Sequence, residues 1–364
     1  MLNGCVSQVD ALGAPEFERK GTNTPSGDPN QMKPILCEYQ VLDFQHGTGR
    51  LLVPYLVSSE VKTEFDDMDD IALREHQQGF EETSSTHKGG GCDQASNYAA
   101  YMMSSYPHIF LFAVLIFGDR ARLLRLDRSG GILTTSFDHK SQDYLSQLLF
   151  RFSKLDAYQR GLDPTTIIAT PAEKELLSNS LAEYRARLAP RNTDYLDPTL
   201  DPLFPAYKVN VRSKTLIDED IEFDLIIQFP FSDYNSLVGR YTRGYAAYHV
   251  QEERLVFLKD YWRVDDATTD SEVEMYKRLF AGDSDVTGLP DIIALGDVIH
   301  DGHLQTAPTQ GPTDVDDPEP QFLGARKPNT LVHVRVVQEL AIPLDSALNS
   351  KEVVETVYDA VVCK

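Results

Sequence analysis

Residues 239–263 read GRYTRGYAAYHVQEERLVFLKDYWR, and this stretch decides the expected fold of the C-terminal half of the chain. Its alternating apolar residues and its glycines predict a strand, a glycine loop, a second strand, a turn and a third strand. Gly239 and Gly244 stand at the first and third glycine positions of a GxGxxG pattern, and Tyr241 stands at the middle one. Lys259 follows fifteen residues after Gly244 and ends the apolar run LVFLK. The stretch therefore predicts an antiparallel hairpin with a glycine loop and a lysine on its last strand.

A glycine loop followed by a strand lysine is the arrangement with which protein kinases hold ATP. There the loop covers the phosphates with backbone groups, and the lysine neutralises the α and β phosphates when a carboxylate on the next helix holds it. The predicted helix 271–280, SEVEMYKRLF, offers Glu272 and Glu274. Glu272 fits better, because Tyr276 and Leu279 at +4 and +7 would pack inward. Two glycines and a lysine alone leave an ordinary solvent-facing hairpin as the alternative.

Several blocks of the sequence extend this pattern over most of the chain: ARLLRLDRSGGILTTSFD, YLSQLLFRFSKLDAYQRGLDPTT, GRYTRGYAAY, LVFLKDYWR, EVEMYKRL and HVRVVQELAIPLDSALNSKEVVETVYDA. In these blocks, and from VPYLVSSEVK to the last residue, the chain resembles the fungal-type protein kinase family of mushroom-forming fungi. The resemblance implies a family-specific N-terminal domain and a kinase-like N-lobe with Lys259 and Glu272 as its catalytic pair. It also implies that residues 337–340, including Glu339, contact the adenine of ATP. Mg²⁺ as cofactor and a Ser or Thr hydroxyl of a protein as acceptor are implied with it.

The same resemblance implies that some catalytic parts are missing from this sequence. In the family, the helix that contains VYDA is followed by a histidine–arginine–aspartate catalytic loop and a metal-binding aspartate, whereas this sequence ends at Lys364 without either motif. We therefore expect a truncated or pseudokinase-like chain that is inactive by itself. A partner that covers the surface facing the C-lobe is expected with it. The alternative is a non-catalytic nucleotide-binding or interaction module, or a truncated gene product.

The N-terminal half contains a second candidate site. Glu60 and Lys62 form an ExK triplet at the end of a predicted strand, and Asp43 lies on the preceding predicted strand. In nucleases of the restriction-enzyme type, such carboxylates hold Mg²⁺ and the lysine orients the attacking hydroxide. An ExK triplet arises about once by chance in a chain of this length. A Mg²⁺-dependent nuclease is therefore the weaker alternative for this half.

Charge and composition exclude several other functions. The 364 residues carry a formal net charge of −22, which argues against broad binding of nucleic acid or anionic membranes. The dense basic cluster is formed by four arginines, expected on one solvated strand face: Arg120, Arg122, Arg125 and Arg128. The four cysteines form no CxxC pair, the longest apolar run (109–117) is too short to span a bilayer, and the N-terminus lacks a signal-peptide pattern. We therefore expect a cytoplasmic or nuclear protein.

Turn and proline signals divide the chain into parts of an α+β fold. Residues 1–32 are expected to be a flexible leader, and residues 33–188 an αβ domain with a mixed sheet, in an order reminiscent of restriction-type nucleases. Residues 189–205, with four prolines, are the expected linker. Residues 206–345 are expected to form the kinase-like N-lobe, and residues 346–364 the start of a C-lobe. Strands are expected at 35–44, 51–62, 109–117, 120–128, 131–137, 207–211, 221–229, 292–299 and 331–337, and helices at 94–105, 141–155, 171–188 and from 350 onward.

Overall fold

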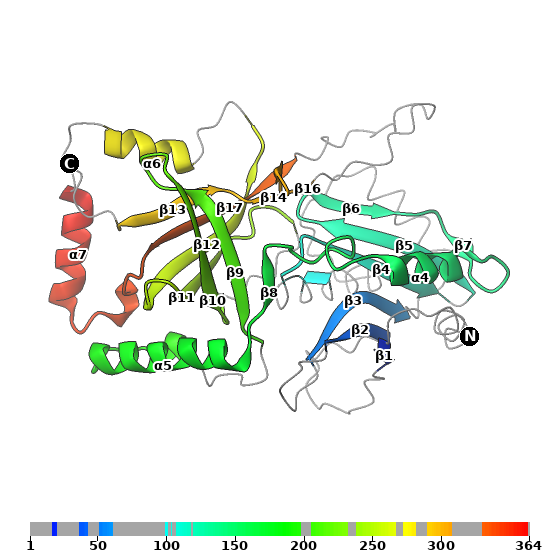
Figure 1. Ribbon diagram of the computed structural model, residues 1–364, viewed down its shortest axis with the longest axis horizontal. Coiled ribbons are helices and arrows are strands. Elements are labelled where there is room, and N and C mark those ends of the chain that lie inside the picture. The colour runs from blue at the N-terminus through cyan, green and yellow to red at the C-terminus, as the bar shows by residue number, and fades with distance from the viewer. Residues whose placement is uncertain are drawn as a thin grey trace. The chain divides into compact units, whose positions relative to one another are not determined.

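A computed structural model gives the structure of the chain, which divides into two compact units (Figure 1). The first unit contains residues 1–163, 235–239 and 307–330, and the second unit contains the remaining residues. The structure describes residues 17–19, 36–42, 51–60, 99–100, 103, 107–117, 119–197, 205–231, 238–266, 272–281, 290–307 and 330–362. Each unit is built on its own sheet.

The first unit contains a seven-stranded mixed sheet. Its strands, in sheet order, are β1 (Phe17–Arg19), β2 (Leu36–Leu42), β3 (Leu51–Glu60), β4 (Phe110–Phe117), β5 (Arg120–Asp127) and β6 (Gly130–Leu133), while β7 (Phe137–Asp138) pairs with β5. The pairing of β3 with β4 is parallel, and the other pairings are antiparallel. The expected meander of β4, β5 and β6 and the mixed character of this sheet are confirmed.

Helical residues cover part of this sheet. Helix α4 (Tyr144–Lys154) buries Leu145, Leu149 and Phe152, and the Phe152 ring meets the Phe112 ring of β4 edge-on at 6.1 Å. Ala99, Ala100 and Met103, within the expected helix 94–105, are helical and buried. The expected helix 141–155 is therefore found as α4, with Tyr144 exposed at its start, and the three described residues of the expected helix 94–105 are helical.

The arginine cluster of β5 does not form a solvated face. The side chain of Arg122 is 8% exposed, and Arg128 is 1% exposed and donates a hydrogen bond to the carbonyl of Met103 at 3.1 Å. Arg125 forms an ion pair with Asp127 at 2.8 Å. Strand alternation shows which residues share a face but not whether that face meets water, and a guanidinium has five donors that internal carbonyls and carboxylates can satisfy. The expected solvated face was therefore wrong.

The second unit contains an eight-stranded sheet that closes on itself. Seven of its strands run in the order β10 (Asp220–Ile227), β11 (Arg243–His249), β12 (Arg254–Val264), β17 (Leu331–Glu339), β13 (Ile292–Asp297), β9 (Tyr207–Lys214) and β8 (Thr166–Ile168), and the eighth strand, β16 (Thr306–Ala307), pairs with β17. Strand β9 also pairs with β10 along its length, which closes the ring of strands. The two-residue strands β14 (Ile299–His300) and β15 (His303–Leu304) form a separate hairpin, and β16 (Thr306–Ala307) follows them.

The described residues of the second unit also form three α-helices and two short 3₁₀ turns: α5 (Pro171–Leu188), α6 (Glu272–Ala281), α7 (Ser350–Val362), η1 (Asp194–Leu196) and η2 (Leu344–Ser346). Figure 1 shows α5 and α6 at opposite ends of the strands of this sheet. No helix in the described ranges combines the length and the apolar character that a membrane span requires. Strands and helices together agree with the expected α+β class.

Helix α5 begins at a capping box. The Thr170 hydroxyl accepts a hydrogen bond from the Glu173 amide at 3.2 Å, the Glu173 carboxylate accepts one from the Thr170 amide at 2.8 Å, and Pro171 occupies the first turn. The helix buries Leu177 and Leu181 against the second sheet. It therefore lies in the second unit, whereas the sequence analysis placed residues 171–188 in the N-terminal domain. Its apolar side chains have partners on strands far along the sequence, which local patterns do not reveal.

Candidate nucleotide-phosphate site

The structure brings Lys259 of β12 together with Glu272, the first residue of α6. The Lys259 ammonium lies 2.8 Å from each of the two Glu272 carboxylate oxygens. The two side chains are 29% and 19% exposed, so the pair lies at an accessible surface and is not sealed in the core. Glu274, the alternative partner in the sequence, is exposed on α6. The geometry thus selects Glu272 as the carboxylate beside this lysine.

Helix α6 holds Glu272 in place by packing on the sheet. Val273 and Tyr276 lie against a buried cluster whose members come from β12, β13 and β17: Tyr261, Leu295, Val334 and Val336. The expected inward packing of Tyr276 is therefore found. Leu279 is 43% exposed, so the expectation that it packs inward was wrong. Lys277, on the same helix, forms an ion pair with Asp218 of the β9–β10 turn at 2.5 Å.

Tyr261 is a third member of the site that the sequence analysis missed. It follows Lys259 by two residues, so both side chains share one face of β12. Its ring centre lies 5.0 Å from the Lys259 ammonium, and its hydroxyl forms a hydrogen bond with Glu272. Burial, and then the negative charge of Glu272, raises the pKa of Tyr261 above its usual value, so the hydroxyl keeps its proton and donates. The two-residue spacing was the available signal.

The glycines lie differently from the expected loop. Gly244 is inside β11, where it pairs with Lys259, and a Cβ atom there would come within 2.8 Å of the Phe257 ring. Gly239 belongs to the first unit, where its amide donates to the Arg128 carbonyl at 2.8 Å, and is not grouped with Lys259. Both glycine positions thus have local structural uses.

Tyr241 takes over the backbone conformation of the missing middle glycine. Its φ of 38° lies in the left-handed region that glycine favours, and the residue is only 3% exposed. Its ring centre lies 5.0 Å from the guanidinium of Arg243. Burial of the ring against this cation helps to offset the cost of the backbone conformation.

Behind Lys259, the opposite face of β12 carries a buried charge network. Asp260 lies 3.0 Å from His333 Nε2, 3.1 Å from Arg335 Nε and 3.2 Å from Arg243 Nη2. Burial alone would raise the pKa of Asp260, but the charges of His333, Arg243 and Arg335 outweigh it and hold that pKa well below its usual range. Trp262 stacks on the His333 ring at 4.7 Å. The network fastens β12 to both neighbouring strands at the level of the lysine.

The expected adenine-contacting stretch, residues 337–340, forms the end of β17 and its continuation. Glu339 is exposed, and its amide donates to the Asp291 carbonyl at 3.0 Å. Leu340 is buried in the cluster around α5, and its carbonyl accepts a hydrogen bond from the Tyr184 hydroxyl at 3.5 Å. Polar groups of this stretch therefore already have partners within the chain.

The second candidate site is described only in part. Strand β3 ends at Glu60, whose partner in the parallel pairing is Ile116 of β4. Asp43 and Lys62 lie outside the described residues, and the nuclease-like arrangement is not confirmed. Within the described ranges, no group of three or more His, Cys, Asp or Glu side chains is placed to hold a metal ion.

Comparison with known proteins identifies the family. A family model described as fungal protein kinase matches residues 56–363, which is most of the chain. Neither a search of the curated proteins nor a search of the solved structures found a match. The matched residues include β12 with Lys259, α6 with Glu272, and β17. The chain belongs to the fungal protein kinase family.

Proposed function

We propose that the second unit is the nucleotide-gripping N-lobe of a fungal-type protein kinase and that Lys259 binds the phosphates of ATP. The observation that carries this proposal is the ammonium of Lys259 held 2.8 Å from both oxygens of Glu272. In protein kinases the phosphate-binding lysine lies on a strand and pairs with a glutamate of the following helix. The order β12, α6, β13 has the same sequence of parts.

The residues present fit the phosphate end of the nucleotide. A lysine ammonium is a compact charge with three donors, so it can contact phosphate oxygens while it keeps its carboxylate partner. Glu272 holds the Lys259 ammonium in place, and Tyr261 in turn holds Glu272 by its hydroxyl. Mg²⁺, when bound with ATP, neutralises charge that develops on the phosphates. The chain's own contribution is to fix the position of one cation beside them.

Phosphoryl transfer to Ser or Thr hydroxyls is the reaction that the family membership supports for the proposed enzyme. It also requires a base that accepts the hydroxyl proton and carboxylates that hold the metal. The sequence contains neither an HRD nor a DFG tripeptide. We therefore propose that these 364 residues bind nucleotide without transferring phosphate. The alternative function, a non-catalytic nucleotide-binding or interaction module, is supported by the same pair of Lys259 and Glu272. A phosphotransfer assay distinguishes it from a kinase.

An ATP derivative with an acyl phosphate tests the lysine directly, because it acylates lysines that lie at the nucleotide's phosphates. We expect Lys259 to be acylated at least about tenfold faster than Lys277, a factor that corresponds to about 1.4 kcal/mol, and excess ATP to protect Lys259 alone. Lys277 is the matched control because it lies on α6 and pairs with a carboxylate, Asp218. Equal acylation of the two lysines, without protection by ATP, would contradict the proposal.

Radiolabelled ATP tests the second half of the proposal. With general and basic protein substrates, we expect no incorporation by the 364-residue chain, for the reason given above. Incorporation that Lys259→Ala abolishes would show that the chain contains a catalytic apparatus that the sequence motifs do not reveal.

A further inference from the structure

One face of β12 carries the lysine and is covered by a helix on each side of it. Because strand side chains alternate, Phe257, Lys259 and Tyr261 point to the same face. Helix α6 packs at the Tyr261 end. Helix α5 packs at the Phe257 end, where Phe257 and Leu255 lie against the same cluster as the helix. Lys259 therefore lies between two helix-covered patches of one continuous face.

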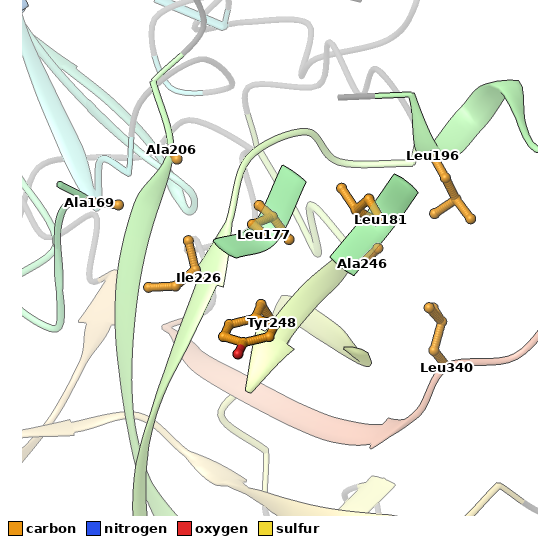
Figure 2. Packing of buried hydrophobic residues seen from close by; sticks show 9 residues of the cluster. All are labelled: Ala169, Leu177, Leu181, Leu196, Ala206, Ile226, Ala246, Tyr248 and Leu340. Carbon is orange, nitrogen blue, oxygen red and sulfur yellow. The ribbon is translucent and has the colours of Figure 1, made fainter. Parts of the chain in front are cut away.

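The patch under α5 is apolar and closely packed. Leu177 and Leu181 of the helix are 0% and 6% exposed, and they share a cluster with Ala246 and Tyr248 of β11 and with Leu340 after β17. Figure 2 shows Leu177 and Leu181 beside Ala246 and Tyr248 in this cluster. The other side of the helix faces solvent, since Leu176 is 44% exposed. Helix α5 thus uses one narrow stripe to seal the patch.

The neighbouring aromatic residues complete the seal. The rings of Phe257 and Phe231 stack at 5.8 Å and 8°, directly over the position that lacks a Cβ at Gly244. Tyr184, near the end of α5, reaches the carbonyl of Leu340 at 3.5 Å. A base bound beside Lys259 needs an apolar surface and a backbone acceptor for its amino group. Both are present here, and both are occupied by α5.

We propose that α5 is an intramolecular cap on the base-binding half of the nucleotide site, and that nucleotide binds only when this helix leaves the sheet. The proposal rests on the proposed function, because it assumes that Lys259 marks the phosphate end. Lys259 is accessible to the phosphates of a nucleotide, whereas α5 covers the apolar surface that would contact the base. The cap explains this difference. Displacement of α5 would expose Ala246, Phe257 and Leu340 together, next to the lysine.

Outside the patch, two ion pairs join the helix to the rest of the second unit. Glu173 pairs with Lys208 at 2.8 Å at its beginning, and Arg185 pairs with Asp197 at 3.1 Å near its end. These ion pairs are partly exposed and therefore hold the helix weakly. The two buried leucines supply most of the contact with the sheet, since they are the buried side chains of the helix.

Substitution of one buried leucine, with its exposed neighbour as control, tests the cap. In the full chain, Leu177→Ser removes apolar contact under α5, and Leu176→Ser makes the same chemical change on the exposed side. When a binding-competent state is rare, the apparent dissociation constant is raised by the inverse of its population. We therefore expect Leu177→Ser to bind a non-hydrolysable ATP analogue at least about tenfold more tightly than wild type in calorimetry, and Leu176→Ser to match wild type within about twofold.

Two further measurements keep the test decisive if Leu177→Ser does not fold. Tyr184→Phe removes only the contact with the Leu340 carbonyl, and we expect it to tighten binding in the same direction. In the wild-type chain, a saturating concentration of the analogue should reduce the hydrogen-exchange protection of α5 while leaving that of β12 unchanged. Unchanged protection of α5 in the nucleotide complex would overturn the cap.

The outcomes separate the cap from the proposed function. Wild type that binds as tightly as both Leu177→Ser and Tyr184→Phe refutes the cap and leaves the phosphate site standing. The phosphate site is refuted, and the cap with it, by one combination of results. In that case Leu177→Ser is folded, hydrogen exchange shows that its α5 is open, and the variant still binds no nucleotide. If the double variant Leu177→Ser with Lys259→Met binds nucleotide as tightly as Leu177→Ser, the role of Lys259 is refuted and the cap is not.

Discussion

Asp260→Asn probes the network that fixes the lysine strand from behind. The substitution keeps the size of the side chain and removes its charge. In the wild-type chain, Asp260 is 4% exposed and lies 3.0–3.2 Å from nitrogens of His333, Arg335 and Arg243. The side chains of the three partners are only 3–11% exposed, so none of them can turn to bulk water without disturbing the sheet. The variant therefore leaves two guanidinium groups buried without their carboxylate.

The expected loss is large for one substitution. Removal of one partner from a buried ion pair costs about 3–5 kcal/mol, because the remaining charge stays desolvated. Urea unfolding followed by tryptophan fluorescence measures this cost in the second unit. The chain has a single tryptophan, Trp262, which is 2% exposed and stacks on His333 within the network. Its emission reports the unfolding of the sheet that holds Lys259.

An exposed ion pair of the same sheet supplies the control. Arg212 and Glu222 pair at 2.8 Å across β9 and β10, with side chains that are 66% and 54% exposed. Because water solvates both charges, Glu222→Gln should leave the urea midpoint unchanged. The reasoning is refuted if Asp260→Asn shifts the midpoint no more than Glu222→Gln does.

Three further predictions concern other contacts of the second unit. Thr170→Ala removes the hydroxyl that caps α5 at the Glu173 amide, so we expect a loss of about 1 kcal/mol in the same urea assay. Tyr261→Phe removes the hydrogen bond to Glu272, so it should slow labelling of the site by the acyl-phosphate probe and cost about 1–2 kcal/mol of stability. The pKa of Asp260 is lowered by folding, so its contribution is complete above about pH 4 and is lost as the pH falls from there through the folded-state pKa. Urea midpoints measured from pH 7 down to pH 3 should fall below pH 4 in wild type and fall less in Asp260→Asn.

The sequence predicted most helices and strands, because their signals are local. The bounds of α5 agree with the expected helix 171–188, since Thr170 and Pro171 begin it and Pro190 follows its end. The expected strands of the meander in the first unit and of the sheet in the second are found within a few residues. Which sheet receives α5 was not predictable in this way. Leu177 meets Ala246 across about 70 residues of sequence, and no periodic pattern in the helix identifies a partner at that distance.

The candidate site was predictable to the extent that it follows from strand and helix periodicity. Lys259 and Glu272 could be paired because a strand lysine and the first carboxylate of the next helix have few other ways to meet. Tyr261 could have been found from its two-residue spacing. The cap could not, since it depends on the packing of α5. The arginines of β5 were misjudged because alternation carries no information about water.

The pair of Lys259 and Glu272 is not explained by stability. Both side chains are partly exposed, and an ion pair in that setting contributes about 0–1 kcal/mol. Yet the hydroxyl of Tyr261 is buried where it contacts Glu272. Asp260 is also buried, and it stays ionised through the cations that join β12 to its neighbouring strands. The Lys259–Glu272 pair itself therefore fixes the position of the ammonium more than it contributes to the free energy of unfolding. A positioned cation that contributes little to stability supports the proposal that Lys259 binds an anionic group such as phosphate.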